Sequence, residues 1–197
     1  MFTGIIETTG NVKALEPGGS NISFWIESSL ASALKIDQSL SHNGVCLTVE
    51  AVHENQHKVT AIAETLEKST LGGLQIGSII NLERCMTLNG RLDGHIVQGH
   101  VDTVAECIDL VEKGGSWQLE FMITENFSAL IVEKGSISLN GISLTIFDVT
   151  QTTFKVAIIP YTYHNTNISA IKKGQAVNIE FDLIGKYVSR FKELYHH

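Results

Sequence analysis

The chain of 197 residues contains one sequence module twice. Residues 41–49 align with residues 138–146 at an offset of 97, and five of the nine positions are identical. The same offset pairs further identical residues: Phe24 with Phe121, Ser39 with Ser136, Thr65 with Thr162, Gly77 with Gly174, Asn81 with Asn178 and Glu83 with Glu180. A fixed offset held along most of a chain indicates duplication, which constrains the fold more strongly than any local pattern.

Short alternating apolar and polar runs, such as residues 47–52, 58–62 and 79–82, predict about six strands in each copy. Asn43-Gly44 and Asn140-Gly141 lie at the ends of such runs, where Asn-Gly supplies the positive φ angles of a tight hairpin. Residues 28–35 and 124–133 predict short helices that each open with a capping hydroxyl. Regular short strands predict an all-β fold of two small closed barrels, joined by a linker near residues 85–93.

Residues 183–195 predict a C-terminal helix with an apolar stripe. The stripe consists of Ile184, Tyr187, Val188, Phe191, Leu194 and Tyr195. Gly185 weakens this helix by about 1 kcal/mol, so the stripe must pack either on its own barrel or on the same helix of other subunits. We favour other subunits, because nothing later in the chain could cover the stripe. His196 and His197 are either a native tail or added residues.

The net charge of −7 argues against nucleic acid and anionic membranes as partners, because both attract clustered Lys and Arg. The N-terminus shows no signal-peptide pattern, and no stretch approaches the roughly 18 apolar residues of a membrane span. Cys46, Cys85 and Cys107 are odd in number and widely spaced, as expected of free thiols in a reducing compartment. We therefore expect a cytoplasmic protein.

Differences between the copies indicate where chemistry could occur. Cys46 aligns with Ser143, and aligning residues 3–5 with residues 99–101 places His100 opposite Gly4. A thiol and an imidazole could serve as nucleophile and general base. The alternative reading of Cys46 is a small core residue, and the duplication itself could simply have doubled a stable barrel.

No metal or nucleotide motif stands out in the sequence. His95 and His100 are five positions apart, so on an extended strand they would point to opposite faces and not converge on one metal ion. Gly72-Gly73 and Gly114-Gly115 lack the spacing of phosphate-binding loops and are interpreted as turns. We therefore expect no metal site and no dinucleotide or nucleotide fingerprint in this chain.

The motifs of this chain resemble those of the riboflavin synthase family. They occur in order over essentially the whole chain: Met1-Phe2-Thr3-Gly4-Ile5-Ile6, His42-Asn43-Gly44 before Cys46-Leu47-Thr48, Glu64-Thr65-Leu66, Gly94-His95 before Gly99-His100, and Asn140-Gly141-Ile142-Ser143-Leu144-Thr145. This chain departs from the family pattern after Pro160. Relatives often carry an acidic residue or a histidine there, whereas this chain has Tyr161.

The resemblance implies two six-stranded Greek-key barrels, at residues 1–88 and 89–182, and an oligomerisation helix at residues 183–197 that holds a homotrimer. It implies dismutation of 6,7-dimethyl-8-ribityllumazine, in which one molecule gives four carbons to another to form riboflavin and 5-amino-6-(D-ribitylamino)uracil, without a cofactor. The active site is expected between an N-terminal barrel of one subunit and a C-terminal barrel of another. Lumazine synthase is a further candidate partner.

The family's site residues transfer by position. In the first copy the expected substrate contacts are Gly4, Ile5, Ile6, Cys46, Leu47, Thr48, Thr60, Ala61, Ile62, Ala63, Glu64 and Thr65. In the second copy they are Gly99, His100, Val101, Lys134, Ser143, Leu144, Thr145, Ile159, Pro160, Tyr161, Thr162, Tyr163 and His164. Residues expected to matter for turnover are Phe2, Ser39, Cys46, His100 and Asp182.

We hypothesise that His100 assists proton transfer while Cys46 and Ser39 orient or activate the acceptor molecule. Two other functions are compatible with such a fold. A non-catalytic lumazine or flavin antenna protein resembles it, but such proteins tend to lose a histidine where this chain keeps both His95 and His100. A flavin-binding module of a reductase would require a nucleotide-binding partner domain. The sequence therefore favours the enzyme.

Overall fold

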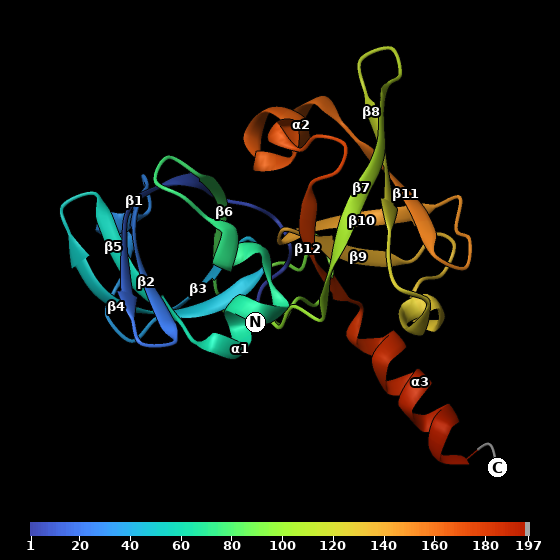
Figure 1. The fold of residues 1–197 in the computed structure, drawn as a ribbon, viewed down its shortest axis with the longest axis horizontal. Coiled ribbons are helices and arrows are strands. Elements are labelled where there is room, and N and C mark those ends of the chain that lie inside the picture. The colour runs from blue at the N-terminus through green and yellow to red at the C-terminus, as the bar shows by residue number, and fades with distance from the viewer. Residues whose placement is uncertain (196–197) are drawn as a thin grey trace.

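Residues 1–195, which the computed structural model describes, form two closed barrels of six antiparallel strands each (Figure 1). His196 and His197 lie outside the described residues. The first barrel consists of β1 (Thr8–Gly18), β2 (Asn21–Glu27), β3 (Ser39–His42), β4 (Val45–His53), β5 (Gln56–Ala61) and β6 (Ile79–Arg84). The second consists of β7 (Thr103–Glu112), β8 (Trp117–Met122), β9 (Ser136–Leu139), β10 (Ile142–Phe147), β11 (Thr153–Ile158) and β12 (Ala176–Phe181).

Both barrels close in the same order, β1-β2-β5-β4-β3-β6 and β7-β8-β11-β10-β9-β12, which confirms the predicted fold class. The β3–β4 and β9–β10 hairpins turn at the two Asn-Gly pairs, and all four of these residues have positive φ, as predicted. Each barrel encloses its own apolar core, built around Phe24 in the first and around Phe121 and Phe154 in the second.

The repeat offset changes along the chain. β1 shifts register between Val12 and Ala14, and β7 shifts between Cys107 and Asp109, so these equivalent bulges are 95 residues apart. The difference arises in the β7–β8 turn, which is two residues longer than the β1–β2 turn and contains Gly114-Gly115.

The alignment that placed Gly4 opposite His100 is therefore wrong by one residue. At the corrected offset Gly4 is equivalent to Gly99, and Ile5 is equivalent to His100. Gly4 and Gly99 share a positive φ, 77° and 83°, which supports this register.

The helices differ in part from the prediction. α3 (Leu183–Tyr195) has the predicted bounds, but residues 28–35 and 124–133 form only the 3-10 turns η1 (Ala31–Ala33) and η3 (Glu125–Leu130), without side-chain caps. η1 has three residues and η3 has six, so they span about one and two turns of a 3-10 helix. Two helices were missed, α1 (Ala63–Lys68) and α2 (Pro160–Asn165), each followed by a 3-10 turn, η2 (Thr70–Gly73) or η4 (Asn167–Ala170).

The two barrels meet through asparagine side chains. The Asn81 amide donates to the Asn140 carbonyl at 2.9 Å, and the Asn178 amide donates to the Asn43 carbonyl at 2.8 Å. Each of these amides belongs to one barrel and each carbonyl to the other. The four residues are related by the duplication, so the junction has an approximate twofold symmetry.

A buried histidine pair lies in the first barrel. His42 Nε2 and His57 Nε2 are 2.9 Å apart, and both rings are shielded from solvent. Burial lowers the pKa of His57 to about 4 and holds the pKa of His42 well below its usual range. Both rings are therefore neutral in the folded protein at neutral pH.

We predict that this pair makes the fold sensitive to mild acid. An unfolded His57 takes up a proton below about pH 6.5, whereas the folded one does so only below about pH 4, so the free energy of unfolding falls across this window. The loss attributable to His57 amounts to about 3 kcal/mol. Urea unfolding of wild type and His57→Gln at several pH values would measure it. Equal pH dependence in both proteins would contradict the prediction.

Candidate active site

Each barrel is completed by a segment from the other copy. The Ser143 N–H, on β10, donates to the Gly4 carbonyl at 2.8 Å, and Ile6 packs against the second core. In the mirror arrangement the Cys46 N–H, on β4, donates to the Gly99 carbonyl at 2.8 Å, and Val101 packs against the first core. The predicted site residues therefore group across the copies, not within them.

Two buried carboxylates hold these exchanged segments. Glu180 accepts hydrogen bonds from the N–H groups of Gln98 (2.6 Å), Gly99 (2.9 Å) and His100 (2.9 Å). Its equivalent Glu83 accepts from the N–H groups of Thr3 and Gly4, at 2.6 and 3.0 Å. Burial raises the pKa of both carboxyls, and the N–H donors counteract it. Such convergent donors are what make a buried carboxylate tolerable.

Glycine is required where the segments touch the barrels. A Cβ on Gly99 would lie 2.5 Å from Cys46 Cβ, and a Cβ on Gly4 would lie 2.6 Å from Ser143 Cβ. The ring of Phe2 lies beneath Gly99, where the same Cβ would approach it to 2.9 Å, and the Phe2 backbone pairs with Val97. Phe2 is fully buried, and its ring supports the position of Gly99.

A cavity of about 280 Å³ lies beside α1 at the first barrel. It brings together six predicted residues, namely Cys46, Glu64, Thr65, Gly99, His100 and Val101. The sequence missed three further lining residues: Val45, Lys68 and Ser69. A signal for Lys68 existed in its spacing of one helical turn from Glu64, with which it forms an ion pair at 2.7 Å. We call this cavity the first pocket.

The Cys46 thiol is half-buried in the first pocket. Burial raises its pKa, and the hydrogen bond with the Ser39 side chain counters this only in part. The thiol form therefore dominates at neutral pH, and a thiolate nucleophile is not prepared here. This favours an orienting role for Cys46 and Ser39 over covalent attack.

A cavity of about 330 Å³ lies beside α2 at the second barrel, and we call it the second pocket. Its lining contains the predicted residues Ile6, Tyr161 and His164, and the sequence missed the rest: Glu7, Thr8, Thr9, Ile79, Asn165, Thr166, Asn167, Ser169 and Ala170. Ser143 lies against Gly4 on the same barrel, and its Oγ is 2.6 Å from His95 Nδ1.

The remaining predicted residues lie in several places. Leu47 and Ala61 are buried in the first core, whereas Ile62, Ile159, Pro160, Thr48 and Thr145 are exposed. Thr60 is bonded to Ser23 and Glu50, Leu144 packs on the second core, and Ala63 and Thr162 are half-buried. Tyr163 stacks on Trp117 at 3.6 Å between ring centroids.

Asp182 and Lys134 lie apart from both pockets. The Asp182 carboxylate accepts from the Ile184 N–H at 2.9 Å and so caps α3. Lys134 is exposed in the turn before β9, with its ammonium 5.6 Å from the centre of the Phe147 ring. Within residues 1–195 no cluster of three or more His, Cys, Asp or Glu is placed to bind a metal ion.

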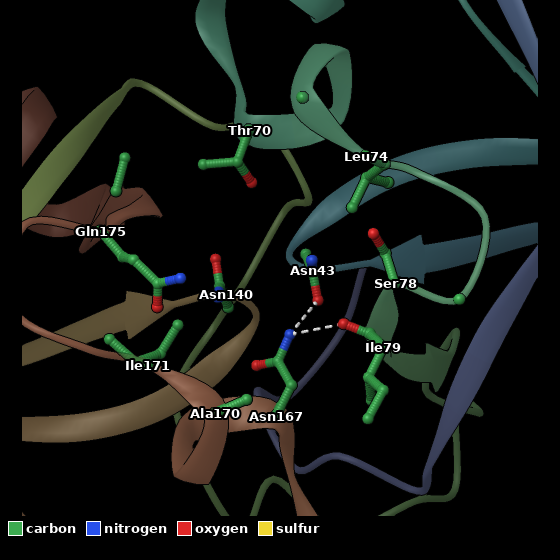
Figure 2. A pocket seen from close by; sticks show the side chains of 13 residues that line it. Asn43, Thr70, Leu74, Ser78, Ile79, Asn140, Asn167, Ala170, Ile171 and Gln175 are labelled. Carbon is green, nitrogen blue, oxygen red and sulfur yellow. Dashed lines mark hydrogen bonds between the residues drawn. The ribbon is translucent and has the colours of Figure 1, made fainter.

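A third cavity, of about 660 Å³, lies at the junction of the barrels (Figure 2). It is lined by pairs related by the duplication, such as Thr70 with Asn167 and Leu74 with Ile171. Figure 2 shows Asn167 reaching Asn43 Oδ1 (2.9 Å) and the Ile79 carbonyl (3.2 Å). None of the site residues predicted from the sequence lines this cavity, although it shares Ile79, Asn167 and Ala170 with the second pocket.

Comparison with known proteins decides the family. The lumazine binding domain matches residues 3–85 and again residues 98–182, which are the two barrels with their exchanged segments. The riboflavin synthase of Bacillus subtilis is 40% identical over 192 residues, covering 97% of this chain and 89% of that protein. This chain belongs to the riboflavin synthase family. The riboflavin synthase of Mycobacterium tuberculosis is 37% identical over 195 residues, covering 96% of this chain and 97% of that protein.

Solved structures agree with this fold. LumP in complex with riboflavin superposes with a TM-score of 0.86 at 20% identity, covering 92% of this chain and 99% of LumP. A similarity at this level of identity concerns the fold alone. None of the helices within residues 1–195 of this riboflavin synthase family member has the length and apolar character needed to cross a membrane.

We predict that Glu180→Gln loosens the first pocket selectively. The change removes a charged acceptor from three N–H groups and should raise the rate at which Cys46 reacts with a thiol reagent by about tenfold or more. The measurement requires a Cys85→Ser background, so that the reagent does not react at Cys85. Cys107 needs no change because it is fully buried. Glu83→Gln is the matched control, because Glu83 holds the segment over the other barrel. Equal acceleration by both variants would disprove the exchanged arrangement.

Proposed function

We propose that this protein is a riboflavin synthase that converts two molecules of 6,7-dimethyl-8-ribityllumazine into riboflavin and 5-amino-6-(D-ribitylamino)uracil. The observation that carries the proposal is that the two barrels share an equivalent frame, made of the docked segment with its glycine and its carboxylate, but carry unequal side chains on it. The frame at the first barrel has Cys46 and His100, where the frame at the second barrel has Ser143 and Ile5. Equivalent frames suit two copies of one ligand, and unequal side chains suit a donor and an acceptor.

The residues near the pockets fit an uncharged heterocycle with a ribityl chain. Backbone groups of the exchanged segments and the hydroxyls of Thr65 and Ser143 offer hydrogen bonds, whereas Lys68 already pairs with Glu64. The reaction requires a proton to leave the 7-methyl group of one lumazine and a bond to form at C7 of the other. His100 is exposed at the first pocket, and we assign it the proton transfers.

The pockets of one chain do not face each other. α1, beside the first pocket, and α2, beside the second, lie on opposite sides of the junction between the barrels (Figure 1). Two bound lumazines therefore need two subunits, with the first pocket of one against the second pocket of another. Such a head-to-tail contact either closes into a ring or continues as a filament.

The C-terminal helix offers the surface for closing a ring. Its apolar residues Ile184, Tyr187, Val188, Phe191, Leu194 and Tyr195 are all more than half exposed. Six such side chains on one short helix call for a covering surface. We propose a homotrimer, with barrels at residues 1–88 and 89–182 and α3, at residues 183–195, at its centre. The predicted helical region extends to residue 197, but its last two residues lie outside the described ones. We further propose that Lys134, which is exposed and lies apart from both pockets of its own chain, contacts the ligand of a neighbouring subunit. We propose the cytoplasm as the location of the trimer and lumazine synthase as the source of its substrate.

We predict that the purified protein forms riboflavin from 6,7-dimethyl-8-ribityllumazine alone, with no added cofactor. His100→Ala should lower kcat by about 100-fold, because general acid–base catalysis contributes at least that much. Cys46→Ala should retain more activity than His100→Ala, because its thiol is not ionised. Riboflavin fluorescence follows the reaction. Tight binding of the lumazine without conversion would instead identify an antenna protein.

We predict that Val188→Asp combined with Phe191→Asp abolishes both the trimer and its activity. The carboxylates would be buried in the helix contact at a cost of several kcal/mol. Sedimentation would then give a monomer, and kcat would fall because no site contains both pockets. Lys192→Glu, on the polar face of the same helix, should leave assembly intact. An active monomer would refute the shared site.

A further inference from the structure

The side chain of Ser143 is held by a buried imidazole from the segment between the barrels. His95 Nδ1 lies 2.6 Å from Ser143 Oγ, and the backbone N–H of His95 donates to the Thr3 carbonyl at 3.1 Å. Gly94 makes this approach possible, since a Cβ there would lie 2.0 Å from the Thr3 oxygen and 3.0 Å from Ser143 Oγ. The segment is therefore shaped to bring His95 to Ser143.

The surroundings of His95 fix which nitrogen carries the proton. The residue is 8% exposed, and its Nε2 has no hydrogen-bond partner among residues 1–195. Burial lowers the pKa of His95, and the nearby Asp182 carboxylate opposes this, so the ring is neutral at neutral pH and carries one proton. A buried N–H without an acceptor is rarer than a buried acceptor without a donor. The proton therefore sits on Nδ1 and is donated to Ser143 Oγ.

We infer that His95 is a positioning residue that turns the Ser143 hydroxyl into a hydrogen-bond donor toward the substrate held at the second barrel. With its oxygen engaged by His95, the hydroxyl directs its own proton to a ring nitrogen or carbonyl oxygen of the uracil-fused heterocycle. Ser143 is only half-buried, so its proton can reach a ligand. The inference rests on the proposed function and gives a role to His95, which is part of a family motif but was not among the predicted site residues.

The first barrel has no equal donor. Its equivalent residue is Cys46, whose thiol is a weak hydrogen-bond donor, and its side-chain partner is Ser39. A hydrogen bond from the Ser143 hydroxyl to the ring stabilises the negative charge that accumulates there when the methyl proton leaves. The second barrel is accordingly the site for the molecule that loses this proton.

A double-mutant cycle tests the inference. Ser143→Ala and His95→Leu should each lower kcat by about tenfold to 100-fold with little change in KM, because the lost interaction acts on the charged state of the ring. The double variant should be no worse than either single variant, since His95 acts only through Ser143. His95→Asn keeps an N–H near the Nδ1 position and should restore most of the activity. His53→Leu, at an exposed histidine, is the matched control.

Multiplicative losses in the double variant, wild-type kcat in Ser143→Ala, or equal defects in His95→Asn and His95→Leu would each overturn the inference. Circular dichroism confirms that each variant is folded before its kinetics are compared. The absorption spectrum of bound 6,7-dimethyl-8-ribityllumazine provides a reading without turnover, and Ser143→Ala and His95→Leu should shift it equally. If the wild type forms no riboflavin, the proposed function fails, while this spectral comparison still tests the orientation of Ser143.

Discussion

The two Asn-Gly turns at the junction are the constraint on which the rest of the structure depends. A Cβ on Gly44 would lie 2.8 Å from the Gly141 backbone nitrogen, and the reverse holds equally. The turns can approach this closely only because both are glycine, and each barrel then satisfies the other's buried carbonyl with an asparagine amide. Buried polar groups with all partners present specify one arrangement, because any shift would leave several of them unpaired. The relative placement of the barrels follows from these few contacts.

That placement allows the two copies to exchange their leading segments. Gly4 and Gly99 each cross the junction and dock on the strand after the other copy's Asn-Gly turn. A buried carboxylate is costly unless donors surround it, and here the N–H groups of the crossing segments are those donors. Glu83 and Glu180 thus depend on the segments as much as the segments depend on them. Neither barrel has a complete pocket without residues from the other copy.

The sequence revealed the duplication, the Asn-Gly hairpins and α3, because each has a pattern of identities, turn residues or helical spacing. It could not reveal the exchange of segments, since a repeat alignment assigns each segment to its own copy. Two extra residues around Gly114-Gly115 also shifted the alignment where His100 was compared with its equivalent. The contact of His95 with Ser143 has no local signal at all, because it joins residues 48 positions apart through tertiary packing. The helices α1 and α2 were missed because six residues are too few for a periodic pattern.

The two barrels share one backbone frame, made of the docked segments with their glycines and carboxylates, but carry different side chains on it. This combination meets a specific requirement of a reaction between two identical molecules. Two molecules of one compound can react as donor and acceptor only if their environments differ, yet both must be recognised in the same way. Positions that build the frame are the same in both copies, as with Glu83 and Glu180. Positions next to the docked glycines differ, as with Cys46 beside Gly99 and Ser143 beside Gly4. Because the glycine contacts and carboxylates hold the backbone independently of these side chains, a substitution at such a position changes the local chemistry and leaves the backbone frame intact. The asymmetry needed for the reaction could therefore arise without loss of either binding site.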